Sequence, residues 1–204
     1  KYWWVGIMLF LLPAAARADG MLIYPPYKPM TETGQKAVIW WDGKKETLIL
    51  STTFRGDAED FAWVIPVPNK PEVTSAKDEL FTALDDLTQP KYDQGYTSPL
   101  MGIGSVSYDG SLKNPTVTVV ETKKVDIYDV TVLEATEGKA LREWLIKNGY
   151  EYPMNRDFLL QYYVLKNWYF VAAKVSTEAL GYVGGSLREG HATPLMLTFE
   201  SSGI

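Results

Sequence analysis

The sequence predicts an α+β fold, with a mostly antiparallel sheet and about three helices packed on one side of it. Strand-like segments come in consecutive runs with few helices between them, which is typical of antiparallel sheets and not of alternating βαβ units. Of the 204 residues, 46% are hydrophobic and 13% are aromatic, which is enough to fill the core of one domain.

The first half of the chain predicts three strands and a helix. Residues 36–42 and 45–54 alternate as strands, and Asp42-Gly43 between them is a hairpin signal because these turn positions need positive φ. This register places two sets on the core face: Ala37, Ile39 and Trp41 with Leu48, Leu50 and Phe54. Trp40 falls on the other, more polar face. Residues 61–67 form a third strand, which Pro66 and Pro68 confine to an edge or a strand end.

A helix is predicted between Ser75 and Pro90, with Ser75 as N-cap and Asp78 at the N3 position. Its expected inward stripe consists of Leu80, Leu84 and Leu87, with Phe81 beside it. Residues 89–115 contain several glycines and prolines, so they predict a long loop, and loops of this length are often functional.

The second half predicts two strands, two helices and two more strands. Residues 116–125 and 127–135 are rich in Val and Thr, and residues 168–176 are apolar on both faces, as in a central strand. The last strand spans 194–200 and follows a glycine-rich loop. The first of these two helices runs from a Thr136 cap to Gly149, with Ala140, Leu141, Trp144 and Leu145 inward. The second is capped by Asn155, with Phe158, Leu159, Tyr162 and Leu165 inward.

Residues 1–18 predict a signal peptide. A basic start precedes an apolar run that is too short for a comfortable transmembrane span, and Ala16-Arg17-Ala18 then predicts cleavage between Ala18 and Asp19. Residues 19–204 would then form a single α+β domain, which we expect to be truncated at its C-terminus. The expected location is the periplasm, the cell surface or the extracellular space, with membrane contact only through an uncleaved signal segment or a missing C-terminal anchor.

Composition excludes several functions. The chain has no cysteine, so disulfides, thiolate metal sites and a cysteine nucleophile are excluded, and with one histidine a multi-histidine metal site is excluded too. The net charge of −5 argues against broad nucleic-acid binding. We expect no cofactor.

Several segments together resemble a known family. They include Gln35 to Trp40, Gly56 to Pro68, Thr88-Gln89-Pro90, Tyr128-Asp129-Val130, Asn148-Gly149-Tyr150 and Trp168 to Val171. The chain is similar over residues 19–199 to the bacterial domain of unknown function 2330 family, and the segment from Phe61 to Pro68 is the most specific. The resemblance implies an exported bacterial protein and carries no activity, cofactor or catalytic residue. Many relatives carry Cys-Gly after the signal peptide, where this chain has Asp19-Gly20.

Three groups of residues are candidates for chemistry. Asp57, Glu59 and Asp60 are hard oxygen ligands for Ca²⁺, but they supply at most half of the ligands this ion needs, so they more simply solvate a turn. His191 is a candidate base with Ser186 and Glu189, although no nucleophile motif surrounds it. The adjacent Asp85 and Asp86 point about 100° apart on a helix, which makes them a solvated face and not a facing catalytic pair.

The exposed aromatic residues are candidates for binding. Trp40 on the hairpin and three tyrosines of the long loop, Tyr92, Tyr96 and Tyr108, could contact a protein or stack on a sugar. The other interpretation is that these rings fold onto the core, as we expect for Trp41, Trp63, Trp144 and Trp168.

The leading hypothesis is a non-catalytic, exported envelope module that binds an envelope protein or a cell-surface polymer. One alternative is an envelope hydrolase that uses acidic residues, with or without a metal. Another is an assembly or stalk component, which predicts self-association.

Overall fold

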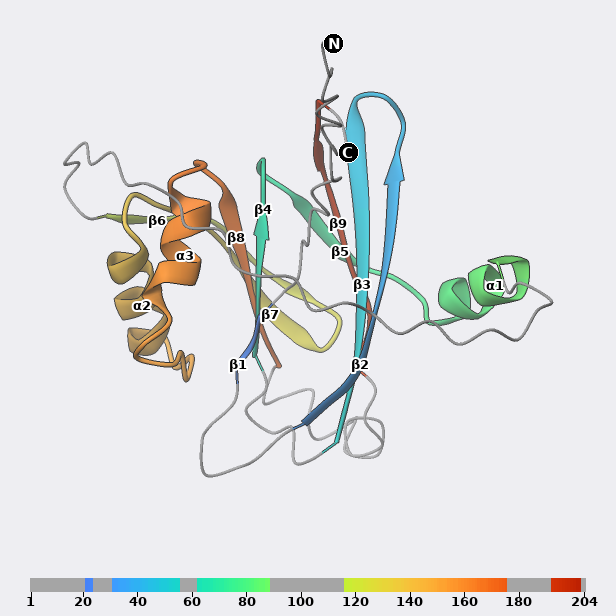
Figure 1. Cartoon of the computed structure of the whole chain (residues 1–204), viewed down its shortest axis with the longest axis horizontal. Coiled ribbons are helices and arrows are strands. Elements are labelled where there is room, and N and C mark those ends of the chain that lie inside the picture. Colours follow the sequence, from blue (N-terminus) through green and yellow to red (C-terminus); the bar gives the residue numbers. More distant parts are fainter. Residues whose placement is uncertain (1–20, 24–30, 56–61, 89–115, 176–191, 203–204) are drawn as a thin grey trace, which may run out of the picture.

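The computed structural model describes residues 21–23, 31–55, 62–88, 116–175 and 192–202. Within them the strands form two antiparallel sheets that pack face to face (Figure 1). The five-stranded sheet has the order β1-β4-β8-β7-β6, and the four-stranded sheet has the order β2-β3-β9-β5. The prediction of antiparallel strands is confirmed, but the prediction of a single sheet is wrong.

The strands are β1 (Met21–Ile23), β2 (Thr31–Trp41), β3 (Lys45–Arg55), β4 (Ala62–Val67), β5 (Glu72–Ser75), β6 (Val117–Val125), β7 (Tyr128–Ala135), β8 (Tyr169–Val175) and β9 (Leu195–Glu200). The helices are α1 (Glu79–Thr88), α2 (Gly138–Lys147) and α3 (Asp157–Val164). The predicted strands match within a few residues. The short strands β1 and β5 were not predicted, because three or four residues carry little periodicity.

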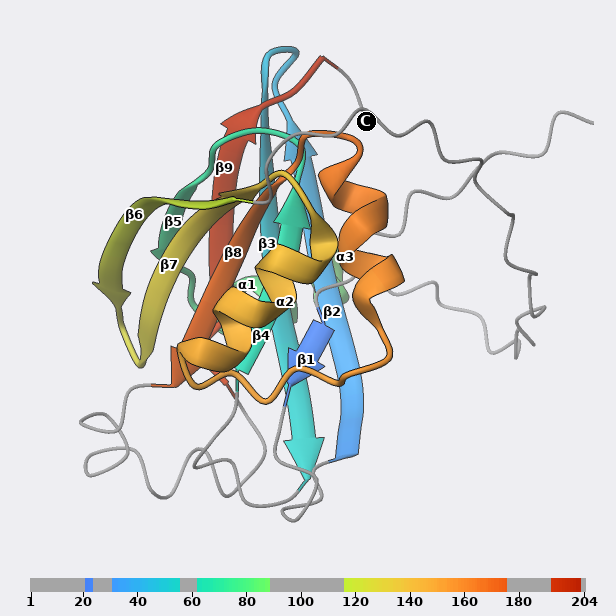
Figure 2. The same ribbon diagram turned by 90° about the vertical axis from the view of Figure 1, so that its left-hand side faces the viewer.

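One core lies between the two sheets. It is formed by inward-pointing residues of β3 to β9, including Leu48 and Leu50 of β3, Trp63 of β4 and Val171 of β8. A second core lies on the opposite face of the five-stranded sheet, where Phe170 of β8 meets the helices α2 and α3 (Figure 2). Strand β8 is buried on both faces and lies between β4 and β7, as the continuous apolar run predicts. β4 lies between β1 and β8, so it is not an edge strand, and Pro66 stands next to its end, beyond the part that pairs with β1.

The helices do not share one side. Helices α2 and α3 cover the five-stranded sheet, whereas α1 lies by the outer face of β2 and β3 at the other end of the molecule (Figure 1). Among the described elements the order of layers is therefore α2 and α3, five-stranded sheet, four-stranded sheet, α1. The difference arises because each sheet leaves an outer face, and sequence periodicity does not say which sheet a helix covers.

The predicted C-terminal end of α2 is confirmed, whereas its predicted N-cap is wrong. Gly149 has φ +79°, and the amides of Gly149 and Tyr150 donate to the carbonyl oxygens of Ile146 and Leu145, which is a Schellman ending. At the other end the N-cap residue is Glu137, not Thr136. The Gly138 amide donates instead to Oε1 of Gln161 on α3, at 2.7 Å. A side chain distant in sequence therefore replaces the local cap.

The inward face of α3 was predicted wrongly. Phe158, Tyr162 and Leu165 are exposed, and the buried residues are Leu160 and Val164. The polar residues on the buried side have specific partners on α2. Asp157 Oδ1 lies 3.4 Å from Nε of Arg142, and Gln161 caps Gly138. Hydrophobicity alone missed this face because two polar residues belong to it.

Helix α1 begins later than predicted. Ser75 pairs with Leu195 as the last residue of β5, so it is not an N-cap, and the Asp78 carbonyl accepts the bond from the Phe81 amide. Phe81 is the buried residue of this helix, whereas Leu87 is 81% exposed. The predicted leucine stripe is therefore wrong at Leu87.

Candidate functional site

The β2–β3 hairpin holds the most exposed tryptophan of the described residues. Its turn has Gly43 at φ +99°, and the Asp42 amide donates to the Lys45 carbonyl at 3.1 Å. The Lys45 and Lys44 amides donate to Oδ1 of Asp42 at 2.7 and 2.9 Å and lower the pKa of this carboxyl, the Lys45 bond contributing most. Trp41 pairs with Glu46, so the turn residues are Gly43 and Lys44 and not Asp42-Gly43 as predicted. The register differs by two residues, which keeps each side chain on its predicted face.

Strand β2 is an edge strand, and its apolar residues are exposed on both faces. Trp40 is 62% exposed on the outer face. Ile39 and Trp41, which share a face with the core residues of β3, are still 44% and 37% exposed. The opposite sheet does not cover β2 as it covers β3. The core-face prediction therefore holds for Leu48, Leu50 and Phe54 of β3 and fails for the residues of β2.

Trp41 is partly fixed by a hydrogen bond. Its indole nitrogen donates to the Ser201 carbonyl at 3.2 Å, which joins the hairpin to the end of β9. Of the other tryptophans that were expected to be structural, Trp63 is fully buried and Trp144 and Trp168 are half-buried.

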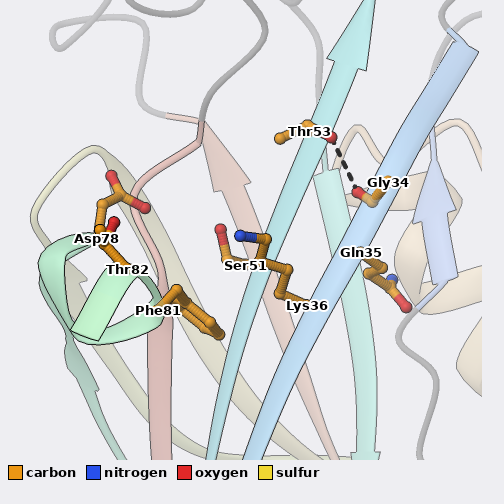
Figure 3. Close-up of a pocket in the computed structure, with 8 residues that line it drawn as sticks. All are labelled: Gly34, Gln35, Lys36, Ser51, Thr53, Asp78, Phe81 and Thr82. Atoms are coloured by element: carbon orange, nitrogen blue, oxygen red, sulfur yellow. Dashed lines mark hydrogen bonds between the residues drawn. The ribbon is translucent and has the colours of Figure 1, made fainter. Parts of the chain in front are cut away.

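A groove runs between α1 and the outer face of β2 and β3. Its volume is about 440 Å³, and its lining includes Gln35, Ser51 and Phe81 (Figure 3). Nζ of Lys36 lies 2.9 Å from Oδ2 of Asp85, so an ion pair ties α1 to the strand. Asp85 therefore lies on a solvated helix face, as predicted, and it also forms an ion pair with β2. The groove lies on the face that carries Trp40, which is four residues along the strand from Lys36.

Two other hollows lie outside this groove, and one of them includes Lys45 at the start of β3. One, of about 450 Å³, is lined by three lysines and three glutamates whose charges balance: Lys45, Lys70, Lys123, Glu72, Glu121 and Glu200. The Lys123 ammonium at 2.9 Å holds the pKa of the Glu121 carboxyl below its ordinary value. The other hollow, of about 230 Å³, is lined mainly by threonines with Glu134 and Trp168.

The perturbed tyrosines are structural. Burial raises the pKa of Tyr150 to about 12, and it raises the pKa of Tyr128 and Tyr152 as well. The Tyr128 hydroxyl donates to the Thr193 carbonyl at 2.9 Å, and the Tyr152 hydroxyl donates to the Arg156 carbonyl at 2.9 Å. A hydrogen bond to Glu134 raises the pKa of Tyr169. All four are therefore neutral donors near neutral pH.

Most of the other predicted site residues lie outside the described residues. They are Asp57, Glu59, Asp60, Tyr92, Tyr96, Tyr108, Ser186, Glu189, His191 and the cleavage pair Ala18 and Asp19. Within the described ranges, no group of three or more His, Asp or Glu residues is placed to hold a metal ion. No helix in the described part of the chain is long and apolar enough to cross a membrane.

The groove and the exposure of Ile39 were not predicted. The groove depends on α1 returning to β2, and the Lys36–Asp85 pair links these segments by charge. The exposure of Ile39 depends on how far the second sheet reaches. A continuous apolar run from Ala37 to Trp41 was the one available signal, because a half-buried strand normally alternates.

Comparison with protein families finds a match over residues 13–204 to the family described as an uncharacterized protein conserved in bacteria (DUF2330). No curated protein and no solved structure matches the chain.

Proposed function

We propose that this chain, which belongs to the DUF2330 family of uncharacterised proteins conserved in bacteria, is a non-catalytic, exported module that binds another protein of the cell envelope. The binding surface is the outer part of the β2–β3 hairpin, formed by Ile39, Trp40 and Trp41. The observation that carries the proposal is the 62% exposure of Trp40 on an edge strand whose neighbouring apolar residues are also exposed. The support for export is the signal-like pattern of residues 1–18.

An exposed cluster of this kind has a physical cost. Full burial of a large apolar side chain is worth about 1.5–3 kcal/mol, so Trp40 forgoes most of that stabilisation and the partly exposed Ile39 and Trp41 forgo part of it. Tryptophan is also enriched among the residues that carry the binding energy of protein interfaces. A protein partner is favoured over a polymer because the apolar residues lie along a sheet edge, where a second polypeptide can also satisfy the backbone.

Site-specific photo-crosslinking tests this surface. A photoreactive phenylalanine analogue replaces Trp40 in the bacterium that encodes the chain, and the envelope fraction is irradiated. We expect a discrete crosslinked species. The matched control carries the same analogue at Phe158, an aromatic residue of α3 that is 65% exposed. Equal crosslinking at both positions, or none at Trp40, would contradict the proposal.

Export is tested separately by fractionating the cells and measuring the N-terminus of the mature chain. We expect the protein in the envelope or the medium, with Asp19 as its first residue. Retention in the cytoplasm with residues 1–18 still attached would refute this part of the proposal.

A further inference from the structure

We infer that the edge of β2 that no described strand pairs with joins antiparallel to β2 of a second copy of this chain, with Val38 opposite Val38 of the other copy. The inference rests on the proposed function, because it uses the same strand, and it goes further by naming a second molecule of this chain as the envelope protein that is bound there. Pairing of this kind is isologous, so two copies use one self-complementary surface and form a closed dimer.

β2 differs from the other sheet edges in the described part of the chain. β1 has three residues and β5 has four, which is too short to template a long partner strand. β6 carries a bulge near Val119 and charged residues at Glu121, Lys123 and Lys124. These are the devices by which proteins protect their edges. β2 has 11 residues, and Lys36 is the one charged residue between Gln35 and Trp41.

Half of the backbone N–H and C=O groups of β2 point in the plane of the sheet away from β3. The closing bond of the hairpin joins Asp42 to Lys45, so Asp42 directs its N–H toward β3. Hydrogen-bonded and non-hydrogen-bonded pairs alternate along an antiparallel ladder. Gln35, Ala37, Ile39 and Trp41 therefore direct their N–H and C=O groups outward, and no described strand pairs with that side. Another extended backbone is the natural match for such a row of donors and acceptors.

The register follows from the regular part of the strand. The register with β3 shifts between Glu32 and Gly34, and the turn begins at Asp42, so Gln35 to Trp41 is the uninterrupted stretch. Its centre is Val38. A two-fold axis there uses all seven residues and places each outward-directed residue opposite another, as the ladder requires. An axis at Lys36 would put two lysines opposite each other, and an axis at Ile39 would draw the turn into the ladder.

The side chains suit this register. On the inner face, Ala37 lies opposite Ile39 of the second copy, which sets a small residue against a large one. On the outer face, Lys36 lies opposite Trp40 of the second copy. The aliphatic stem of a lysine covers an indole ring well, while the Lys36 ammonium keeps its ion pair with Asp85. The apolar residues that are exposed in one copy are therefore covered by the other.

Disulfide trapping tests the register. The chain has no cysteine, so Val38→Cys introduces a single thiol. In the proposed pair the two Cα atoms of residue 38 form a non-hydrogen-bonded pair about 4.5 Å apart, which a disulfide can bridge. The matched control is Lys36→Cys, whose thiol would lie about 13 Å along the strand from its counterpart. We expect mild oxidation to link Val38→Cys into dimers at least tenfold faster than Lys36→Cys. Equal rates, or no dimer of Val38→Cys, would overturn the inference.

Sedimentation velocity tests the wild-type chain. We expect a concentration-dependent dimer that Ala37→Pro abolishes, because proline removes an outward N–H without removing a bond to β3. Ala37→Ser is the matched control and should remain dimeric, and the two variants should have similar circular dichroism spectra. A wild-type monomer at every concentration would refute self-pairing, and crosslinking at Trp40 to a different protein would still uphold the proposed function. A wild-type dimer, together with no crosslink from Trp40 to any other protein, would uphold self-pairing and refute binding to a different envelope protein.

Discussion

Gly138→Ala tests the close approach of α2 to α3. Gly138 is buried at the start of α2, and a Cβ atom there would lie 2.7 Å from the Gln161 amide nitrogen and 2.9 Å from the Asp157 carbonyl oxygen. Both atoms belong to the backbone of α3, so they cannot rotate away as the end of a side chain could. The substitution therefore requires the two helices to separate.

Two effects on the free energy of unfolding oppose each other. Replacing glycine by alanine in a helix stabilises by about 0.5–1 kcal/mol. Overpacking a tight contact costs about 1–3 kcal/mol, and separating the helices also weakens the 2.7 Å bond from Gly138 to Gln161, a cap worth about 1 kcal/mol. The contact outweighs the propensity, so we expect Gly138→Ala to destabilise the fold by about 1–3 kcal/mol.

Urea denaturation followed by tryptophan fluorescence measures the change. Lys139→Ala and Lys139→Gly, at an exposed position in the same turn, give the propensity difference without the contact. Gln161→Ala removes the cap and keeps the glycine, with an expected loss of about 1 kcal/mol. If Gly138→Ala instead stabilises by as much as the Lys139 pair predicts, the helices do not meet at this residue and the reasoning is wrong.

Two further predictions concern pH. The lowered pKa of Asp42 means that its carboxylate stabilises the folded state above its ordinary pKa of 3.8, and that this contribution is lost as the pH falls through the lowered folded value. The difference in unfolding free energy between wild type and Asp42→Ala should therefore narrow below about pH 4, and a constant difference would contradict the prediction. Burial raises the pKa of Tyr150 from 10.0 to about 12, so the folded state should lose stability as the pH rises above 10.0. Tyr150→Phe should reduce this alkaline loss measured by circular dichroism, and an unchanged pH profile would refute the assignment.

Local patterns predicted most of the secondary structure. The alternation in residues 45–54 and the apolar run of residues 168–176 correspond to β3 and β8, because each strand buries the faces that its sequence makes apolar. The apolar stripe of α2 is also correct, since Leu141 and Leu145 are fully buried. The face of the sheet on which Trp40 lies follows from parity along the strand, which a shift of two residues in the turn does not change.

Long-range pairing was not predictable in the same way. β9 lies between β3 and β5, and nothing near these three segments in the sequence indicates that order. The inward face of α3 depends on Arg142 and Gly138 of another helix, because the Arg142 guanidinium pairs with Asp157 and the Gly138 amide donates to Gln161. The candidate site has the same origin, because the groove exists only where α1 packs beside β2 and β3, and the position of β2 at a sheet edge depends on how the described strands pair.

The sequence by itself determined which segments are strands and helices, which side of each strand is apolar, and the exclusion of cysteine chemistry. Only the tertiary structure decided that there are two sheets, that α1 lies apart from α2 and α3, and that the apolar residues of β2 stay exposed. The physical reason is that periodicity reports what a segment needs to bury, whereas exposure depends on which distant segment arrives to cover it.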